Sequence, residues 1–288
     1  MTTASNNLQK NTSDISFTYQ NKILQKTKRL SSISHKSTQT KHFTKITVAS
    51  WNIGHFALGK DKDTKITAEV FDKKKADYTS FLNSIHPDLI AVIEYNPLFV
   101  NATEKDSAIS AREAIFSNYK DAKIGTKYDY NCNAIFSNGF PIKKQNEVIF
   151  NKSVQTRYYL CVNILMDGDI VKVVSTHLDW NQGKEGATDR MLQIQELIKT
   201  FQNDKYVILC ADWNTDSPNE FDAFQQAGYR MANHGYLGDI ATYPAGENMR
   251  RYFDNIIVKG FALNNINILN RPDLSDHCLI KADLIKLP

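Results

Sequence analysis

Hydrophobic and polar positions divide most of the chain into short strands and amphipathic helices. Apolar residues at helical spacing predict helices at 73–85, 108–119 and 190–201. Continuous or alternating apolar runs predict strands at 46–51, 89–93, 133–137, 147–150, 157–165, 170–175, 206–210, 253–258 and 278–285. The Asp167-Gly168 dipeptide between two of these strands is a strong hairpin signal.

One more helix is predicted to begin after Ser217. Ser217 suits the N-cap position, and Pro218 suits the first helical position. Glu220 stands where it would complete a capping box with Ser217. The sequence therefore predicts both the start of this helix and the contact that holds it.

The strands are apolar throughout, which indicates sheets that are covered on both faces. The hairpin is antiparallel, and this argues against a purely parallel, doubly wound sheet. We therefore expect an α+β fold in which two mixed β-sheets pack face to face and helices flank them, a four-layer αββα sandwich.

The amino-terminal segment has a different composition from the rest. Residues 1–45 contain eight Lys or Arg and one acidic residue, whereas the remainder has a small acidic excess. Ser, Thr, Asn, Gln and Lys dominate residues 1–44, and such a segment buries too little apolar surface to offset its chain entropy. We expect a disordered basic tail at 1–44 and a single folded domain at 45–288.

Neither a membrane span nor a secretory signal is evident. The longest apolar runs have about six residues, whereas a membrane-spanning helix needs roughly 20. The four cysteines lie in or beside apolar strands, which predicts buried free thiols. We expect a monomer in a reducing, cytoplasmic setting.

Polar residues gather where the apolar strands end, and a rigid scaffold fixes the geometry of side chains placed there. The set comprises Asn52, Glu94, His177, Asp212, Asn214, Asp254, Asp276 and His277. Four carboxylates without a cysteine ligand suit a hard divalent cation, Mg²⁺ with Mn²⁺ as a substitute, better than Zn²⁺. Two histidines can transfer protons near neutral pH. The set suits attack of water on a phosphorus ester.

The same residues lie in six short motifs. They are Trp51-Asn52-Ile53-Gly54, Ile93-Glu94, Thr176-His177-Leu178, Ala211-Asp212-Trp213-Asn214, Phe253-Asp254-Asn255-Ile256 and Ser275-Asp276-His277. In this order and spacing the chain resembles the endonuclease/exonuclease/phosphatase superfamily, which has the deoxyribonuclease I-like fold. The resemblance extends from residue 51 to residue 277, and each motif lies at a predicted strand edge.

The resemblance implies a metal-binding role for three residues and a water-activating role for one. Glu94 would be the main metal ligand, helped directly or through water by Asn52 and Asp276. Asp212 would orient or deprotonate the attacking water.

The resemblance also implies which residues contact the phosphate. Asn214 would hydrogen-bond the scissile phosphate, and His277 would contact it or act as a base. Asp254 or Asp276 would fix the tautomer of His277. His177 would stabilise developing charge or deliver a proton, so the division of acid and base between the two histidines stays open.

Four residues outside the six motifs also have predicted roles. Arg157 would face the phosphate, and Trp180, on a polar loop, could stack against a base or sugar; its alternative is a packed surface tryptophan. Arg190 and Gln193 are expected to fasten a helix to the site loop rather than touch substrate.

The resemblance implies a Mg²⁺-dependent phosphoester hydrolase with a phosphate-ester substrate, for which nucleic acid is one candidate. We favour a nuclease that cleaves phosphodiester bonds by metal-assisted attack of water. The alternative within the superfamily is a phosphatase or phosphodiesterase on a small sugar, inositol or sphingolipid phosphate. Intact Glu94, Asp212 and His277 argue against a catalytically silent binding module.

Overall fold

The computed structural model describes residues 44–57, 68–99, 109–127, 131–151, 155–233, 241–245 and 249–288. The basic tail expected at 1–44 lies outside the described residues, except for Thr44. Within the described part, no helix has the length and apolar character that crossing a membrane requires.

The first sheet contains one parallel pair of strands among antiparallel neighbours. Strands β1 (Lys45–Asn52) and β2 (Leu89–Tyr95) run parallel, and helix α2 (Ala68–Ile85) connects them. The sheet order is β15-β16-β1-β2-β6-β5. Its antiparallel members are β5 (Asp121–Ile124), β6 (Cys132–Ser137), β15 (Phe261–Leu269) and β16 (Leu279–Lys286).

The second sheet repeats this plan. Strands β9 (Asp169–His177) and β10 (Val207–Asp212) run parallel, and helix α4 (Lys184–Thr200) connects them. The order is β11-β14-β10-β9-β8-β7. The antiparallel members are β7 (Ile142–Ile149), β8 (Tyr158–Met166), β11 (Arg230–Met231) and β14 (Asp254–Lys259).

Several shorter helices and strands connect the strands of the two sheets. The 3₁₀ turn η1 (Gly54–Ala57) follows β1, and α5 (Pro218–Gln226) follows β10. The remaining elements are β3 (Leu98–Phe99) paired with β4 (Ile109–Ser110), helix α3 (Ala111–Ile115), and β12 (Tyr243–Ala245) paired with β13 (Met249–Arg251).

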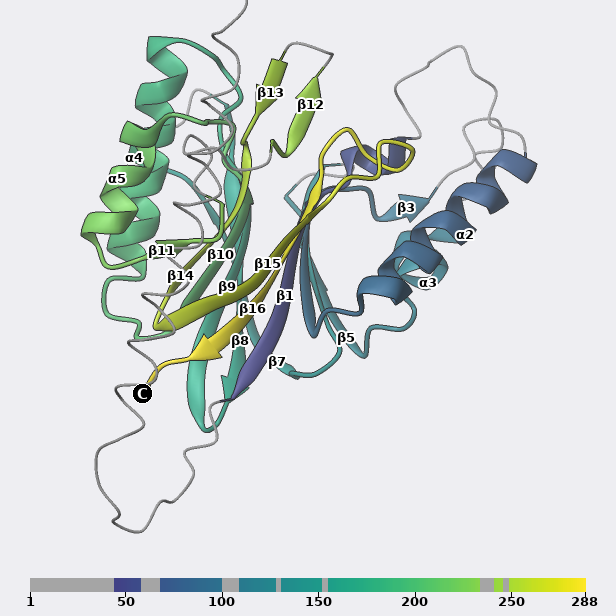
Figure 1. Cartoon of the computed structure of the whole chain (residues 1–288), viewed down its shortest axis with the longest axis horizontal. Coiled ribbons are helices and arrows are strands. Elements are labelled where there is room, and N and C mark those ends of the chain that lie inside the picture. The colour runs from purple at the N-terminus through teal and green to yellow at the C-terminus, as the bar shows by residue number, and fades with distance from the viewer. Residues whose placement is uncertain are drawn as a thin grey trace, which may run out of the picture. The chain divides into compact units, whose positions relative to one another are not determined.

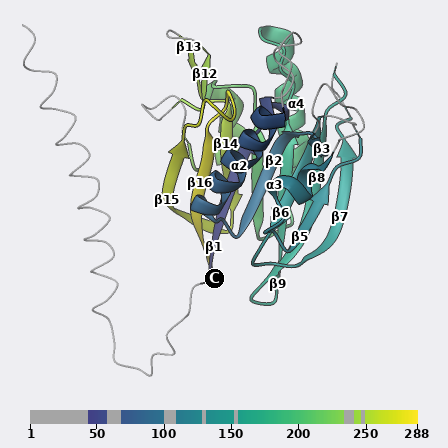
Figure 2. The ribbon, with the colours of Figure 1, turned by 90° about the vertical axis from the view of Figure 1, so that its right-hand side faces the viewer.

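The two sheets pack face to face, and helices cover both outer faces, α2 and α3 on one side and α4 and α5 on the other (Figures 1 and 2). The two faces of one strand pack into different hydrophobic layers. Ile46 and Val48 of β1 lie in the core between the sheets. Ala49 and Trp51 of the same strand pack under α2 and α3. Burial on both faces explains why the central strands are apolar throughout, and the four layers confirm the αββα prediction.

Two local predictions were wrong. The helix expected at 108–119 is reduced to α3 (Ala111–Ile115), because the chain turns after Ile115 to insert aromatic rings into the core. Phe116 stacks on Phe136 with ring centroids 4.1 Å apart, and Tyr119 packs beside both. The capping box is also absent. Ser217 is the N-cap of α5, but its side chain makes no capping hydrogen bond. The Glu220 carboxylate pairs with Arg190 instead of the Ser217 backbone N–H, which donates to Thr215 Oγ1.

The prediction for the cysteines is confirmed. All four cysteines are free and buried. Burial raises the pKa of the Cys278 thiol to about 11 and that of Cys161 to about 12, so these thiols stay protonated at neutral pH.

Candidate active site

The site forms where the two parallel pairs end. Asn52 closes β1, Glu94 lies at the end of β2, His177 closes β9 and Asp212 closes β10. The carboxyl ends of neighbouring parallel strands meet at one edge of a sheet, which is the usual place for ligand sites in such units. Asn52 Nδ2 donates to Asp212 Oδ2 at 2.9 Å and so joins the two sheets at this edge.

His277 and Asp254 reach the same edge from antiparallel strands. Asp254 begins β14 directly opposite Asp212, and His277 precedes β16. The Nδ1–H of His277 donates to Asp254 Oδ2 at 2.8 Å. Ser275 Oγ accepts from the backbone N–H of His277 and donates to Asn52 O, so the loop that carries His277 is fixed to β1.

Asp212 stands at the centre of the cluster. Its Oδ2 atom lies 3.5 Å from Nε2 of His177 and 3.7 Å from Nε2 of His277. Its Oδ1 atom accepts from the backbone N–H of Asn214 at 2.9 Å. One buried carboxylate thus faces both imidazoles.

Left-handed backbone conformations concentrate at this edge. Glu94, Asn214 and His55 have φ values of 53°, 53° and 54°. Such conformations cost of order 1–3 kcal/mol for residues other than glycine, and they persist where the surrounding structure imposes them, often at functional sites. At Asn214 the side chain contributes, because Nδ2 donates to Leu178 O at 3.0 Å.

Burial and charge shift the protonation of the cluster. Burial alone would lower the pKa of His277, but the carboxylates of Asp254 and Asp212 outweigh it and raise the pKa to about 10. Burial raises the pKa of Asp212 to about 7, against the pull of His277. Burial, and then the positive charges of Arg157 and His277, holds the pKa of His177 well below its ordinary value of 6.5. His277 is therefore cationic at neutral pH, and His177 is neutral.

A cleft of about 580 Å³ opens over the cluster. Eight of the residues predicted from sequence line it: Glu94, Arg157, His177, Trp180, Asp212, Asn214, Asp276 and His277. The other two, Asn52 and Asp254, are fully buried behind Asp212 and His277. The structure thus brings all ten together, while their individual roles stay predictions.

Sequence reasoning missed one wall of the cleft. Tyr243 packs against the ring of His277, with centroids 4.7 Å apart, and stacks on Phe253. Arg251 lies over the ring of Phe253 and pairs with Asp216 at 3.2 Å. The cluster of Arg and aromatic residues at 250–253 was the available signal.

His55, which lies outside the predicted set of site residues, contacts the predicted metal ligand. Its Nε2 atom lies 3.3 Å from Glu94 Oε2, and His177 Nδ1 lies 3.8 Å from Glu94 Oε1. The carboxylate of Glu94 therefore lies between two imidazoles at the floor of the cleft.

The oxygen donors fit a hard divalent cation. Glu94 is a partly exposed carboxylate that faces the two histidines. Asp254 Oδ1 is buried with no hydrogen-bond partner among the described residues. Donor atoms of Asp212, Asp254 and His277 lie within 4.8 Å of one another, which makes a second position where a cation could bind.

Arg190 and Gln193 hold the loop that follows β9, as expected. Arg190 Nη1 donates to the backbone oxygens of Asp179 and Asn181, and Gln193 Oε1 accepts from the N–H of Asp179. The remaining guanidinium face of Arg190 pairs with Glu220 at 2.8 Å and 3.1 Å. This buried pair joins α4, α5 and the loop that carries Trp180.

Replacing Arg190 with Met is expected to destabilise the protein by about 3–5 kcal/mol, because it leaves the Glu220 carboxylate buried without a partner. Denaturant unfolding measures the change. The control is Lys73→Met, which breaks the exposed pair with Asp77 and should cost about 1 kcal/mol or less. Equal effects of the two substitutions would contradict the role given to the buried pair.

Asp254→Asn is expected to lower the pKa of His277 by roughly one to three pH units, because it removes the closest opposite charge. NMR titration of the His277 ring in metal-free buffer with chelator measures this. The pKa is about 10 in the folded protein and 6.5 ordinarily, so the stabilisation from protonated His277 is complete below pH 6.5 and is lost as pH rises toward 10. An unchanged titration in the variant would show that Asp254 does not hold the proton on His277.

Comparison with known proteins identifies the fold. No protein-family model matches the sequence, and no curated protein matches it. D. rerio TDP2 complexed with a single-strand DNA product is similar at TM-score 0.64 and 17% identity, over 84% of this chain and 99% of that one. An endonuclease/exonuclease/phosphatase from Bacteroides vulgatus is similar at TM-score 0.63 and 17% identity, over 84% and 99%.

A third similar structure has another named activity. The mannosyl-6-phosphatase of Bacteroides thetaiotaomicron matches at TM-score 0.59 and 19% identity, over 83% of this chain and 99% of that one. At such identities the likeness concerns the fold, and function has to be argued from the residues of this site.

Proposed function

We propose that this chain, which has the fold of the endonuclease/exonuclease/phosphatase superfamily, is a metal-dependent phosphoester hydrolase that cleaves phosphodiester bonds. The carrying observation is the charge arrangement at the sheet edge: a buried carboxylate, Asp212, lies between the neutral His177 and the cationic His277. This arrangement offers one base and two hydrogen-bond donors at a single point of the cleft.

Each group has a distinct part in the proposed reaction. Asp212, whose pKa is about 7, accepts the proton of the attacking water near neutral pH. The cationic His277, oriented by Asp254, stabilises negative charge on the phosphate oxygens. Neutral His177 donates a hydrogen bond to the same phosphate. The strained backbone of Asn214 positions its backbone N–H to donate to Asp212 Oδ1.

A hard divalent cation completes the site. Glu94 would hold Mg²⁺ or Mn²⁺, with Asp276 and the carbonyl oxygen of the Asn52 amide nearby as further oxygen donors. When bound, the cation neutralises charge on the phosphate and the leaving oxygen. The protein groups hold the phosphate in position and accept the proton.

The shape of the cleft favours a diester over a monoester. The cleft is lined by Trp180 from the loop after β9 and by Tyr243 and Arg251 from the β12–β13 pair, so two separate segments besides the catalytic cluster offer room for substrate groups. A phosphomonoester needs room on one side of phosphorus only, whereas a diester carries a group on each side. The similarity to TDP2 with bound single-strand DNA product agrees with this choice, and the mannosyl-6-phosphatase marks the alternative, a sugar phosphate.

A panel assay tests the proposal. Single-stranded and duplex DNA, RNA, an aryl phosphodiester, a sugar phosphate and sphingomyelin are incubated with the protein in Mg²⁺, and again with excess chelator. We expect hydrolysis of diesters in Mg²⁺ and none in chelator. Hydrolysis of the sugar phosphate alone would favour the phosphatase alternative, and no hydrolysis of any ester would refute the proposed function.

A further inference from the structure

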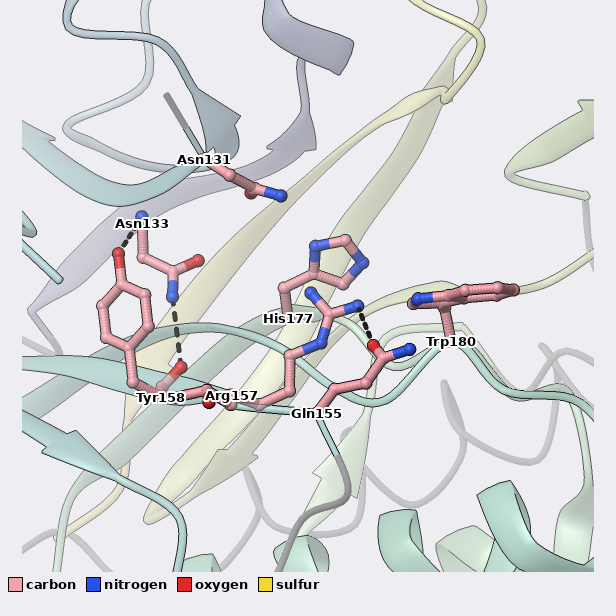
Figure 3. A pocket seen from close by; sticks show the side chains of 8 residues that line it. Asn131, Asn133, Gln155, Arg157, Tyr158, His177 and Trp180 are labelled. Atoms are coloured by element: carbon pink, nitrogen blue, oxygen red, sulfur yellow. Dashed lines mark hydrogen bonds between the residues drawn. The ribbon is translucent and has the colours of Figure 1, made fainter. Parts of the chain in front are cut away.

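A second, smaller cavity adjoins the cleft, and Figure 3 shows the side chains that line it. Its volume is about 240 Å³. It shares four residues with the cleft, namely Asn131, Arg157, His177 and Trp180, and adds Asn133, Gln155, Thr156 and Tyr158. We call these eight residues the side pocket. Its opening therefore lies beside the groups that face the phosphate.

The side pocket is polar but carries no acidic side chain among its lining residues. Three carboxamides line it, those of Asn131, Asn133 and Gln155. A carboxamide presents a donor and an acceptor side by side, which matches the edge of a nucleobase. The polar side chains that line the side pocket do not suit an acyl chain. A cationic group would find no acidic partner among them, and an anionic group would find one only in Arg157.

Hydrogen bonds within the protein fix two of the carboxamides. Asn133 Nδ2 donates to Tyr158 O at 3.2 Å, and the backbone N–H of Asn133 donates to Tyr158 Oη at 2.7 Å. Arg157 Nη2 donates to Gln155 Oε1 at 3.2 Å, so the Gln155 nitrogen points away from Arg157 (Figure 3). Preorganised donors and acceptors lose little entropy when a ligand binds.

Trp180 gives the side pocket an aromatic wall. Trp180 is 57% exposed, so a face of its indole is open to a ligand in the side pocket. Hydrogen bonds of Arg190 and Gln193 with the backbone of Asp179 fix the loop that carries Trp180, and so restrict where the indole can lie. Stacking on such a ring is favourable for any nucleobase.

We propose that the side pocket holds one unstacked nucleobase of the substrate, next to the scissile phosphate. The carboxamides would contact the edge of the base and Trp180 its face. A cavity of this kind admits a base only when the base is unpaired, so the substrate is single-stranded or terminal nucleic acid rather than continuous duplex. This inference rests on the proposed function, because the side pocket has its place beside the phosphate groups.

A binding experiment tests the side pocket without turnover. The protein has three tryptophans, of which Trp51 and Trp213 are 1% and 0% exposed. A base that stacks on Trp180 therefore quenches the exposed part of the fluorescence. In chelator, a nucleoside 5′-monophosphate should quench this emission and bind at least about tenfold more tightly than ribose 5-phosphate. Equal affinities, or quenching that survives Trp180→Ala, would overturn the inference.

A turnover experiment then separates this inference from the proposed function. A dinucleotide and the same diester with an abasic sugar are compared in Mg²⁺, together with an aryl phosphodiester. The intact dinucleotide should have a kcat/KM about tenfold or more above the abasic one, and Trp180→Ala or Asn131→Ala should bring the ratio toward one. Matched controls are Ile170→Ala and Asn203→Ala, exposed residues at the opposite end of the second sheet, which should keep the wild-type ratio.

The outcomes distinguish the two proposals. Hydrolysis of all three diesters with equal efficiency would refute the nucleobase pocket and keep the hydrolase. Hydrolysis of none would refute the hydrolase, and the fluorescence comparison would then decide on the pocket alone. Tighter binding of ribose 5-phosphate than of the nucleoside monophosphate, together with faster hydrolysis of the abasic diester, would show that the carboxamides bind hydroxyl groups instead.

Discussion

Asp212→Asn and His277→Gln are each expected to lower turnover on the order of 10³-fold or more, with little change in substrate affinity. The double variant should be only slightly slower than either single one. The two side chains face each other across 3.7 Å and act on the same phosphate, and groups that act in one transition state are not additive. Initial rates on the best diester of the panel, over a range of concentrations, measure kcat and KM separately.

The choice of substitutions keeps the fold intact. Asn at 212 removes a buried carboxylate whose pKa burial has raised, so stability is not expected to fall much. Gln at 277 can still donate to Asp254, whereas Ala would leave that carboxylate buried and unpaired. Asp222→Asn, an exposed acid of α5, is the matched control and should retain full activity. Turnover within about tenfold of wild type for both single variants would place the chemistry elsewhere.

Glu94→Gln is also expected to lower turnover on the order of 10³-fold, because a charged oxygen ligand becomes a neutral one. Excess chelator should have the same effect on the wild-type protein, and added Mg²⁺ should reverse it. The far-ultraviolet circular dichroism of the variant should match that of the wild type, since Glu94 lies at the partly exposed end of β2. Full activity in excess chelator would remove the metal from the proposal.

Mn²⁺ binding decides between the two candidate cation positions. Electron paramagnetic resonance measures free and bound Mn²⁺ for Glu94→Gln and for Asp254→Asn. A cation held by Glu94 should bind at least about tenfold more weakly in the first variant, and nearly as in the wild type in the second. The reverse result would place the cation among Asp212, Asp254 and His277, whose donor atoms lie within 4.8 Å of one another.

The sequence predicts the central strands well, because burial on both faces leaves a strong local signal. The apolar run at 206–210 appears as β10, and the runs at 46–51 and 89–93 appear as β1 and β2. Edge strands are less predictable: β15 has one face in solvent and includes Asn264, Asn265 and Asn267, with a register shift between Asn264 and Asn267. Nothing in its local pattern distinguishes such a segment from a polar loop.

Tertiary contacts override local signals at two further places. Glu220 stands at the right spacing for a capping box, but the guanidinium of Arg190, 30 residues earlier, offers it a stronger, charge-assisted partner. Phe116 and Tyr119 fit a helical pattern, but the stacking with Phe136 ends the helix before them. Neither competing partner can be identified within a short window of sequence.

The composition of the site was predictable, while its spatial organisation was not. Motifs at strand ends identified Glu94, His177, Asp212 and His277 as a set. That Asp212 lies between the two histidines follows only from how the sheets pack, because Asp212 and His177 end neighbouring strands of the second sheet, whereas His277 precedes β16 of the first. Tyr243 reaches His277 through the β12–β13 pair, a contact with no local sequence signal.

The pairing of β1 with β16 also has a consequence during synthesis on the ribosome. Ser50 of β1 pairs with Ile280 of β16. β1 is therefore synthesised long before the strand with which it pairs on this side. Until then β1 presents an unpaired edge, and a contact of such sequence separation forms slowly. His277 lies directly before β16, so it too emerges late. The nascent chain therefore carries Glu94, His177 and Asp212 long before His277 can join them, and the site is assembled only when β16 completes the first sheet.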